Sequence, residues 1–227
     1  SWLMRASNNK SVNVEDITDA FSVIGVMGPH ARNTLQPLVS TDLSNEKFPF
    51  GTIKKLEIAG TECLALRMSY VGELGWEIYI PVADSINVFD EIMKSGENYG
   101  ITLAGYHAMN SLRLESGYRH WGHDITPVDT PLEAGLGFAI AWDKPNGFIG
   151  KDALIGQRDK TQVKRLIQFR IEDQEILSYH DDPVFRNGEL VGTTTGGMWS
   201  YTEDRCLTMG YISNKNGVDK TLSLIHI

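Results

Sequence analysis

The sequence predicts a protein of mixed helices and strands that ends in a separate all-β module. Apolar, partly β-branched runs alternate with helical patterns over roughly the first half of the chain. The stretch 118–150 is irregular and punctuated by Gly and Pro, and beyond residue 160 short strands follow one another with turn signals between them. We therefore expect a domain boundary between residues 145 and 162, dividing the chain into domains 1–150 and 151–221.

The first domain is predicted to open with a strand, a helix and a strand pair. Residues 20–27, AFSVIGVM, are apolar and partly β-branched, as in a buried strand. The next segment, GPHARNTLQPLV, predicts a helix with Pro29 in its first turn, where the missing N–H has no intrahelical partner to lose. Residues 52–70 predict two strands joined by a turn at Ala59-Gly60.

A third strand and a helix follow in the first domain. Residues 75–82, GWEIYIPV, predict the strand. Asp84 is expected to cap the helix 85–96, which should end at Gly96.

The remaining elements lead into the all-β module. Residues 104–117 show helical spacing, and Gly117 falls where a glycine commonly follows a helix. Another helix is predicted at 150–160. The strand patterns beyond it are separated by Asn-Gly or Gly-Gly turns, and they cover residues 163–171, 183–197 and 205–212.

Composition limits the classes of function. The chain has 227 residues, 41% of them apolar, which is enough to bury a core. Its net charge is −8 with scattered basic residues, and it has no apolar run of 18 residues, so neither nucleic acid nor membrane is an expected partner. Cys63 and Cys206 form no CxxC pair, which argues against a disulfide framework or a zinc ribbon and favours a reducing compartment. We expect a small molecule or another protein as partner.

The stretch SYVGELGWEIYIP, residues 69–81, carries the main candidate site residues, Tyr70 and Glu77. Residue types alone favour a half-buried strand whose glutamate points to water. In the functional interpretation both side chains face a cavity, where the carboxylate accepts two parallel N–H bonds and the ring packs on a flat ligand. A purine, a guanidinium or a pterin would meet that requirement.

The segment HWGHD resembles a metal cluster only superficially. An i, i+3 histidine pair such as His120 and His123 converges on a helix, whereas Gly122 and the following DITP predict a loop. We therefore predict no metal site and expect Asp124 and the histidines to satisfy backbone groups in a buried turn, with Trp121 as a candidate to line a pocket. The chain has no GxGxxG fingerprint and no GxSxG elbow, so it shows no self-contained catalytic apparatus.

Three ordered segments carry a family resemblance, namely SYVGELGWEIYIP, AGYHAMNSLRLESGYRHWGHDITPVDTPLEAGLGFAIAWDKPNGFIGKDAL and VGTTTGG with GYI after it. Together they resemble the folate-binding aminomethyltransferase family, the T-protein of the glycine cleavage system. They are more similar still to the C-terminal half of dimethylglycine and sarcosine dehydrogenases. The resemblance covers residues 1–221 and implies an α+β folate-binding body, incomplete at its N-terminus, followed by a small C-terminal β-barrel.

The resemblance also implies site residues. Tyr70 and Glu77 match the tyrosine and glutamate that hold the pterin of tetrahydrofolate in this family. Met109 stands where the T-proteins have an arginine, which favours the dehydrogenase branch and makes Met109, with Trp121, a candidate to line the pocket. The family's key aspartate is expected upstream of Ser1, so no catalytic residue is assigned.

Arg113 and Glu115 also match the family, and their helical context predicts a structural ion pair. The last residues, LSLIHI at 222–227, match one reading frame of a transposon end used in sequencing libraries and are interpreted as a non-native tail.

The implied enzyme is a flavin-dependent N-methyl amine dehydrogenase that passes a one-carbon unit to tetrahydrofolate. Its FAD is expected in an N-terminal flavin domain of the same full-length chain, and its compartment is the bacterial cytoplasm or the mitochondrial matrix. Three alternatives stay open: a glycine-cleavage T-protein, a formaldehyde-producing oxidase, and a non-catalytic homologue similar to the regulatory subunit of pyruvate dehydrogenase phosphatase.

Overall fold

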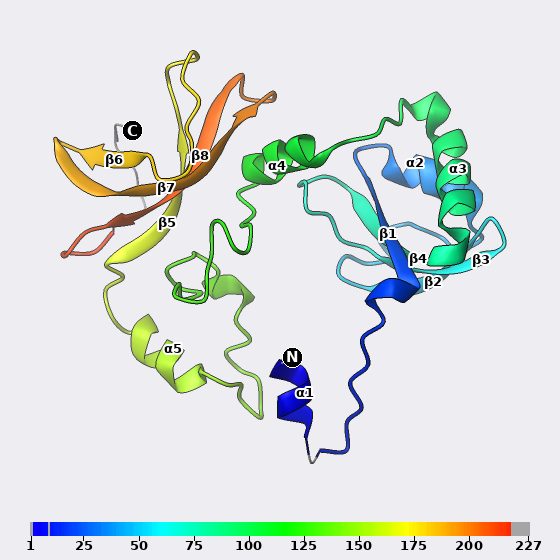
Figure 1. Ribbon diagram of the computed structural model, residues 1–227, viewed down its shortest axis with the longest axis horizontal. Helices are drawn as coiled ribbons and strands as arrows, with labels where there is room; N and C mark the ends of the chain where they lie inside the picture. Colours follow the sequence, from blue (N-terminus) through cyan, green and yellow to red (C-terminus); the bar gives the residue numbers. More distant parts are fainter. Residues whose placement is uncertain (1, 9, 219–227) are drawn as a thin grey trace. The chain divides into compact units, whose positions relative to one another are not determined.

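The computed structural model describes residues 2–8 and 10–218, which form two compact units (Figure 1). Within the described residues, unit 1 comprises 2–8, 10–69 and 73–103, and unit 2 comprises 70–72 and 104–218. The tail predicted at 222–227 lies outside the described residues, and the domain division predicted at residue 150 stays a prediction. Among the described residues, no helix has the length and apolar character needed to span a membrane.

Unit 1 contains a four-stranded antiparallel sheet with α2 (Ala31–Leu35) and α3 (Ser85–Gly96) packed on one face. The strand order is β1-β4-β3-β2. The strands are β1 (Phe21–Met27), β2 (Ile53–Ile58), β3 (Thr61–Leu66) and β4 (Gly75–Pro81). The helices of unit 1 are α1 (Trp2–Ser7), α2 (Ala31–Leu35) and α3 (Ser85–Gly96), with short 3-10 turns at Thr18–Ala20, Gln36–Leu38, Val82–Asp84 and Glu97–Tyr99.

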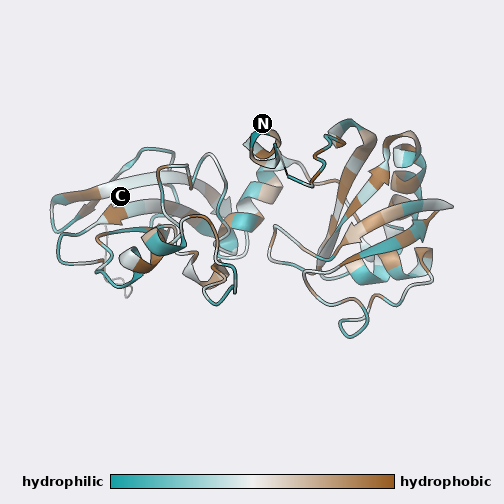
Figure 2. Ribbon diagram, turned by 90° about the horizontal axis from the view of Figure 1, so that it is seen from below, coloured by the Kyte–Doolittle hydropathy of each residue, from teal (hydrophilic) through white to brown (hydrophobic). Residues whose placement is uncertain are grey.

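One face of this sheet forms the core of unit 1. Trp76, Ile78 and Ile80 alternate along β4, are fully buried, and pack with the inner sides of α2 and α3. The alternate residues of β4, Glu77 and Tyr79, project to the opposite face and are half-buried. Hydrophobic residues accordingly gather along the strands of unit 1 (Figure 2).

The four predicted strands of unit 1 and the turn between β2 and β3 are confirmed. Both turn residues have positive φ, 53° at Ala59 and 78° at Gly60, as a two-residue type I′ hairpin loop requires. The placement of Pro29 was wrong, because α2 begins after His30 and the proline lies in the preceding loop.

The two ends of α3 differ in how well they match the prediction. Asp84 precedes α3, but its side chain makes no capping bond. Asp84 belongs to the 3-10 turn Val82–Asp84 and has φ −105° and ψ 2°, so its backbone is not in the extended conformation that a capping residue usually adopts. The α-helix ends at Gly96 as predicted, although a 3-10 turn continues to Gly100, which has φ 70°.

Unit 2 packs one helix, α4 (Tyr106–Glu115), on a second four-stranded antiparallel sheet with strand order β5-β8-β7-β6. The strands are β5 (Lys164–Arg170), β6 (Pro183–Arg186), β7 (Glu189–Ser200) and β8 (Arg205–Ser213), and the other helical segments are α5 (Lys151–Arg158) and a 3-10 turn at Gly137–Ala139. Leu114 of α4 is buried against the sheet residues Leu166, Leu207 and Met209. The long segment between α4 and α5 is mostly irregular, as the sequence predicts.

The predicted end of α4 is confirmed in detail. The N–H of Tyr118 bonds the carbonyl of Arg113, and the N–H of Gly117 bonds that of Leu114, both at 2.9 Å. With Gly117 at φ 66°, this is the Schellman arrangement that ends a helix.

One turn prediction in unit 2 holds and another fails. The Asn187-Gly188 turn is confirmed, with φ of 54° and 83°. The Gly-Gly turn is wrong, because Gly196 and Gly197 lie inside β7, next to a bulge in its pairing with β8. A Cβ at Gly197 would lie 2.6 Å from the carbonyl oxygen of Ser178, so close backbone approach accounts for this glycine.

Candidate functional site

Glu77 stands in the middle of the sheet face that carries no helix. It is paired directly with Gly25 of β1 on one side and with Leu66 of β3 on the other. Directly paired residues project to the same face, so the row continues through Leu66 to Ile53 of β2, which is 58% exposed. The carboxylate therefore rises from an apolar and partly open surface.

Glu77 has little hydrogen bonding of its own. Among the described residues its single partner is the Tyr79 hydroxyl, which donates to Oε2 over 3.3 Å. Burial and then the negative charge of Glu77 raise the pKa of Tyr79, so the phenol keeps its proton and acts as the donor. An ionised carboxylate has about four acceptor positions, so most of the acceptor capacity of Glu77 is available to a ligand.

Tyr70 lies in unit 2 and is held by two contacts. Its hydroxyl donates to the carbonyl oxygen of Arg119 at 2.7 Å, and its ring stacks on that of Tyr118, with centroids 5.9 Å apart and planes at 20°. Burial raises the pKa of Tyr70. Because its proton is already engaged, Tyr70 has its ring and the lone pairs of its oxygen left for a ligand.

The other predicted site residues have different surroundings. Tyr70 and Glu77 belong to different units, so their sharing of one ligand stays a prediction. Met109 is a half-buried residue of α4. Trp121 is 66% exposed in the irregular segment, where it forms an isolated bridge with Ile125. Pocket lining by Met109 and Trp121 also stays a prediction.

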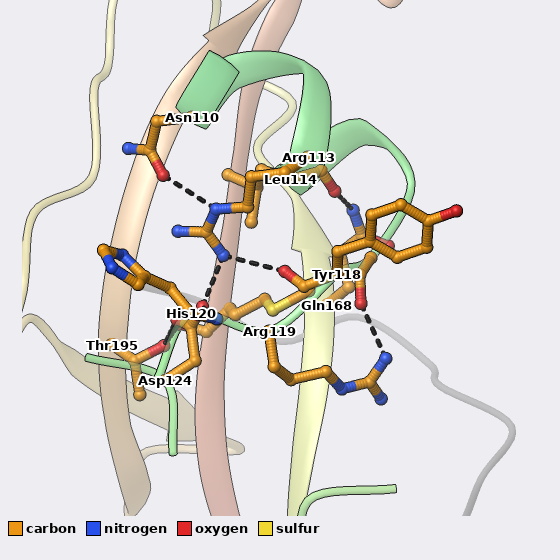
Figure 3. A network of polar contacts seen from close by, with 12 residues as sticks. Asn110, Arg113, Leu114, Tyr118, Arg119, His120, Asp124, Gln168 and Thr195 are labelled. Atoms are coloured by element: carbon orange, nitrogen blue, oxygen red, sulfur yellow. Dashed lines mark hydrogen bonds and ion pairs between the residues drawn. The ribbon is translucent and has the colours of Figure 1, made fainter. Parts of the chain in front are cut away.

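A buried ion pair in unit 2 anchors a network of polar contacts (Figure 3). Arg113 pairs with Asp124, and their side chains are 5% and 0% exposed. A structural ion pair was expected for Arg113, but Glu115 is not its partner. Residues i and i+2 of a helix point in different directions, and Glu115 instead accepts hydrogen bonds from Ser200 and Thr202.

Asp124 accepts three hydrogen bonds, so most of its acceptor positions are filled. Besides the Arg113 guanidinium it accepts the backbone N–H of His120 at 2.8 Å and the hydroxyl of Thr195. The prediction of side chains that satisfy backbone groups in this turn is therefore confirmed for Asp124, whereas the ring of His120 instead lies within 3.3 Å of the Tyr106 hydroxyl. Burial and then the neighbouring His123 lower the pKa of His120. Across the described residues, no three His, Cys, Asp or Glu side chains are grouped so that they could hold a metal ion.

This network also holds the backbone that positions Tyr70. Arg113 donates to the carbonyl of Tyr118 at 2.9 Å, and Asp124 accepts from the N–H of His120. Arg119 lies between those two anchored residues, and its carbonyl receives the Tyr70 hydroxyl. Sequence reasoning missed this role, since nothing in the spacing of Arg113 and Asp124 indicates which backbone groups they hold.

Sequence reasoning also missed Gly25. It is exposed, lies in the interior of β1 and faces Glu77 directly. The available signal was a glycine inside an otherwise apolar strand, a pattern that often marks close approach of a ligand or another backbone.

Family models match both parts of the chain. The GCVT N-terminal domain matches residues 1–144, and the glycine cleavage T-protein C-terminal barrel domain matches residues 164–224. The expected family and the α+β fold class are thereby confirmed.

Individual relatives agree with this assignment. The chain is 42% identical over 208 residues to a 4-methylaminobutanoate oxidase (formaldehyde-forming) of Paenarthrobacter nicotinovorans, and 39% identical over 210 residues to the mitochondrial sarcosine dehydrogenase of Homo sapiens. These matches cover 91% and 92% of the chain but only 25% and 23% of the relatives, so the chain spans about a quarter of their length.

A solved structure agrees at the level of the fold. The glycine cleavage system aminomethyltransferase T from Bartonella henselae superposes with a TM-score of 0.70 at 24% identity, over 84% of this chain and 51% of that one. Sequence models and fold lead to the same assignment: the chain belongs to the glycine cleavage T-protein (GcvT) family.

Proposed function

We propose that this chain supplies the tetrahydrofolate-binding part of a flavin-dependent N-methyl amine dehydrogenase of the dimethylglycine or sarcosine type. The observation that carries the proposal is the carboxylate of Glu77, half-buried on an open sheet face and with one donor, at 3.3 Å, within the part of the chain that the structure describes. Similarity to a sarcosine dehydrogenase and a methylaminobutanoate oxidase supports the amine-oxidising branch of the family.

The residues around Glu77 fit a pterin. The 2-amino-4-oxo edge of a pterin presents N3–H and an amino group as parallel donors, and a carboxylate supplies two matching acceptors. Among the described residues Oε1 of Glu77 has no donor, and Oε2 has one long hydrogen bond. Gly25 and Leu66 beside it offer bare backbone and an apolar side chain to a flat ring.

Bound tetrahydrofolate would supply the amine nucleophile that accepts the one-carbon unit. Glu77 and Tyr70 would hold and orient the pterin, and side chains such as Met109 and Trp121 would help to exclude water. Proton transfer is assigned to the aspartate that the resemblance places upstream of Ser1. Oxidation of the amine is assigned to FAD in a flavin domain of the same full-length chain, in the bacterial cytoplasm or the mitochondrial matrix.

A formaldehyde-releasing oxidase is the second candidate, because one relative is named as formaldehyde-forming. Formaldehyde release from an N-methyl amine that added tetrahydrofolate does not suppress would favour this candidate. A T-protein is disfavoured by Met109, which replaces the arginine expected at that position.

Calorimetric titration of 5-formyltetrahydrofolate into the polypeptide encoded by the complete gene tests the folate proposal. Glu77→Gln should weaken binding by about 1.5 to 3 kcal/mol, the size of a lost charge-assisted hydrogen bond. The matched control is Glu57→Gln, which removes an exposed carboxylate from the same sheet face two strands away. Absence of saturable binding in the folded wild-type protein would disprove the proposal.

A further inference from the structure

The glycine opposite Glu77 has no conformational reason to be glycine. Gly25 is not among the residues with positive φ. Strand β1 pairs with β4 over seven consecutive residues without a register shift, so no bulge requires it either. Glycine in the interior of a strand weakens the strand, because it loses more conformational entropy on folding than other residues and packs no side chain.

Packing does not require the glycine either. A Cβ built at Gly25 would meet only the side chain of Met27, with its terminal methyl carbon at 3.1 Å. That atom is the end of a flexible chain and can move by the few tenths of an ångström needed. By contrast, a Cβ at Gly75 of the same sheet would lie 3.1 Å from the backbone oxygen of Val26, so packing accounts for that glycine.

The missing side chain leaves a space beside the carboxylate that the flexible end of the Met27 side chain reaches. In a directly opposed antiparallel pair the two Cβ positions are about 5 Å apart, so any side chain at position 25 would rise next to Glu77. Gly25 is exposed and Glu77 keeps acceptor capacity toward a ligand, so a backbone floor covered only by the movable end of Met27 lies beside an open acceptor.

We infer that Gly25 is a specificity-determining residue: its bare backbone is the floor on which a flat, donor-edged heterocycle lies while Glu77 binds its edge. The inference rests on the proposed function and deepens it by naming the residue that sets the thickness of the site. It commits to a reduced pterin as the occupant because the ionised glutamate complements the donor edge of that ring. Substitution should act through the volume of the side chain at position 25.

A size series tests this inference, with 5-formyltetrahydrofolate as the probe and the polypeptide encoded by the complete gene as the protein. Gly25→Ala should weaken binding a few-fold, and Gly25→Val by about tenfold or more, as expected for overfilling a fitted site. The same Gly25→Val change should leave the urea midpoint unchanged or raise it, because valine favours strands. A merely structural glycine would lose stability and affinity together.

The control and the other outcomes complete the test. Glu57→Val places the same side chain on the same face two strands away and should leave the affinity within twofold. Wild-type binding that Gly25→Val does not weaken would overturn the role of Gly25 and leave the folate proposal intact. A lowered urea midpoint in Gly25→Val would indicate that a polypeptide segment covers this face and would also overturn the inference. Wild-type protein that binds no folate would overturn the proposed function and, with it, this inference.

Discussion

Two carboxylates of this chain have opposite surroundings. Asp124 of unit 2 is completely buried and accepts hydrogen bonds from a guanidinium, a backbone N–H and a hydroxyl. Glu77 of unit 1 is half-buried on an open sheet face and, from residues 2–8 and 10–218, accepts one long hydrogen bond. Both are acidic residues in a family of enzymes, yet their acceptor positions differ in how far the protein itself fills them.

The difference separates structure from binding. A buried carboxylate whose acceptors are filled by the protein's own donors stabilises the fold and has little capacity left for a ligand. A carboxylate with open acceptor positions on a partly apolar surface contributes little to the stability of the fold but can contribute much to the affinity for a ligand. By this criterion Asp124 is structural, despite its place in a histidine-rich segment, and Glu77 is the candidate for binding.

Removal of the buried Asp124 carboxylate should have the largest effect. Asp124→Ala leaves the Arg113 charge buried without its partner and should lower the free energy of unfolding by about 3 to 5 kcal/mol. Urea unfolding followed by circular dichroism measures this. Asp124→Asn, which keeps an acceptor but not the charge, should lose less. A loss below about 1 kcal/mol for the alanine variant would contradict the structural role.

Asp129 offers a milder case with a pH signature. Burial alone would raise its pKa, but hydrogen bonds from Lys164 and Thr126 outweigh burial and hold the pKa below its usual value. Its stabilising contribution is therefore fully present above the unfolded-state pKa, about 3.9, and is lost as the pH falls through the lower folded-state pKa. At pH 7, Asp129→Asn should cost about 2 kcal/mol in urea unfolding.

The pH series supplies the control for Asp129. The difference in unfolding free energy between wild type and Asp129→Asn should shrink as the pH falls below about 4, because the wild-type carboxyl then becomes neutral as well. A difference that stays constant from pH 7 to the acid limit would show that charge plays no part in this contact.

The open carboxylate should respond in the opposite direction. Glu77→Leu removes a poorly bonded charge from a half-buried strand position. It should raise the free energy of unfolding by about 0.5 to 1 kcal/mol, because replacement of a functional residue often stabilises the fold at the expense of activity. Urea unfolding without ligand measures it. A loss of more than about 1 kcal/mol would place Glu77 with Asp124 as a structural residue.

The sequence predicted more of the fold than of the site, because the elements depend on local sequence signals and the site depends on contacts between distant residues. Strands such as β4 and the end of α4 at Gly117 depend on residue alternation and on one positive-φ glycine, both visible in the sequence. The partner of Arg113 is 11 residues away through an irregular loop, and no periodicity predicts it. Gly25 and Glu77 are 52 positions apart, and their pairing depends on strand register, so only the structure brings them together.

The smallest effect is expected where two cations share a neutral acceptor. In unit 1 the guanidinium groups of Arg32 and Arg67 both donate to Oδ1 of Asn45, at 2.6 and 2.7 Å, and both lie against the Trp76 ring. Among the described residues neither arginine has a carboxylate within 4.0 Å. Asn45→Asp keeps the acceptor oxygen and adds a charge, so it should raise the free energy of unfolding by about 0.5 kcal/mol.

Salt separates the added charge from the retained hydrogen bonds at Asn45. The gain from Asn45→Asp should disappear in 1 M NaCl, where the screening length is about 3 Å. Asn45→Ala, which removes the acceptor itself, should destabilise the protein at both low and high salt. An equal gain at both salt concentrations would mean that hydrogen-bond geometry, and not charge, determines the strength of this contact. The criterion that sets Asp124 apart from Glu77 would then have to include hydrogen-bond geometry as well as the number of filled acceptor positions.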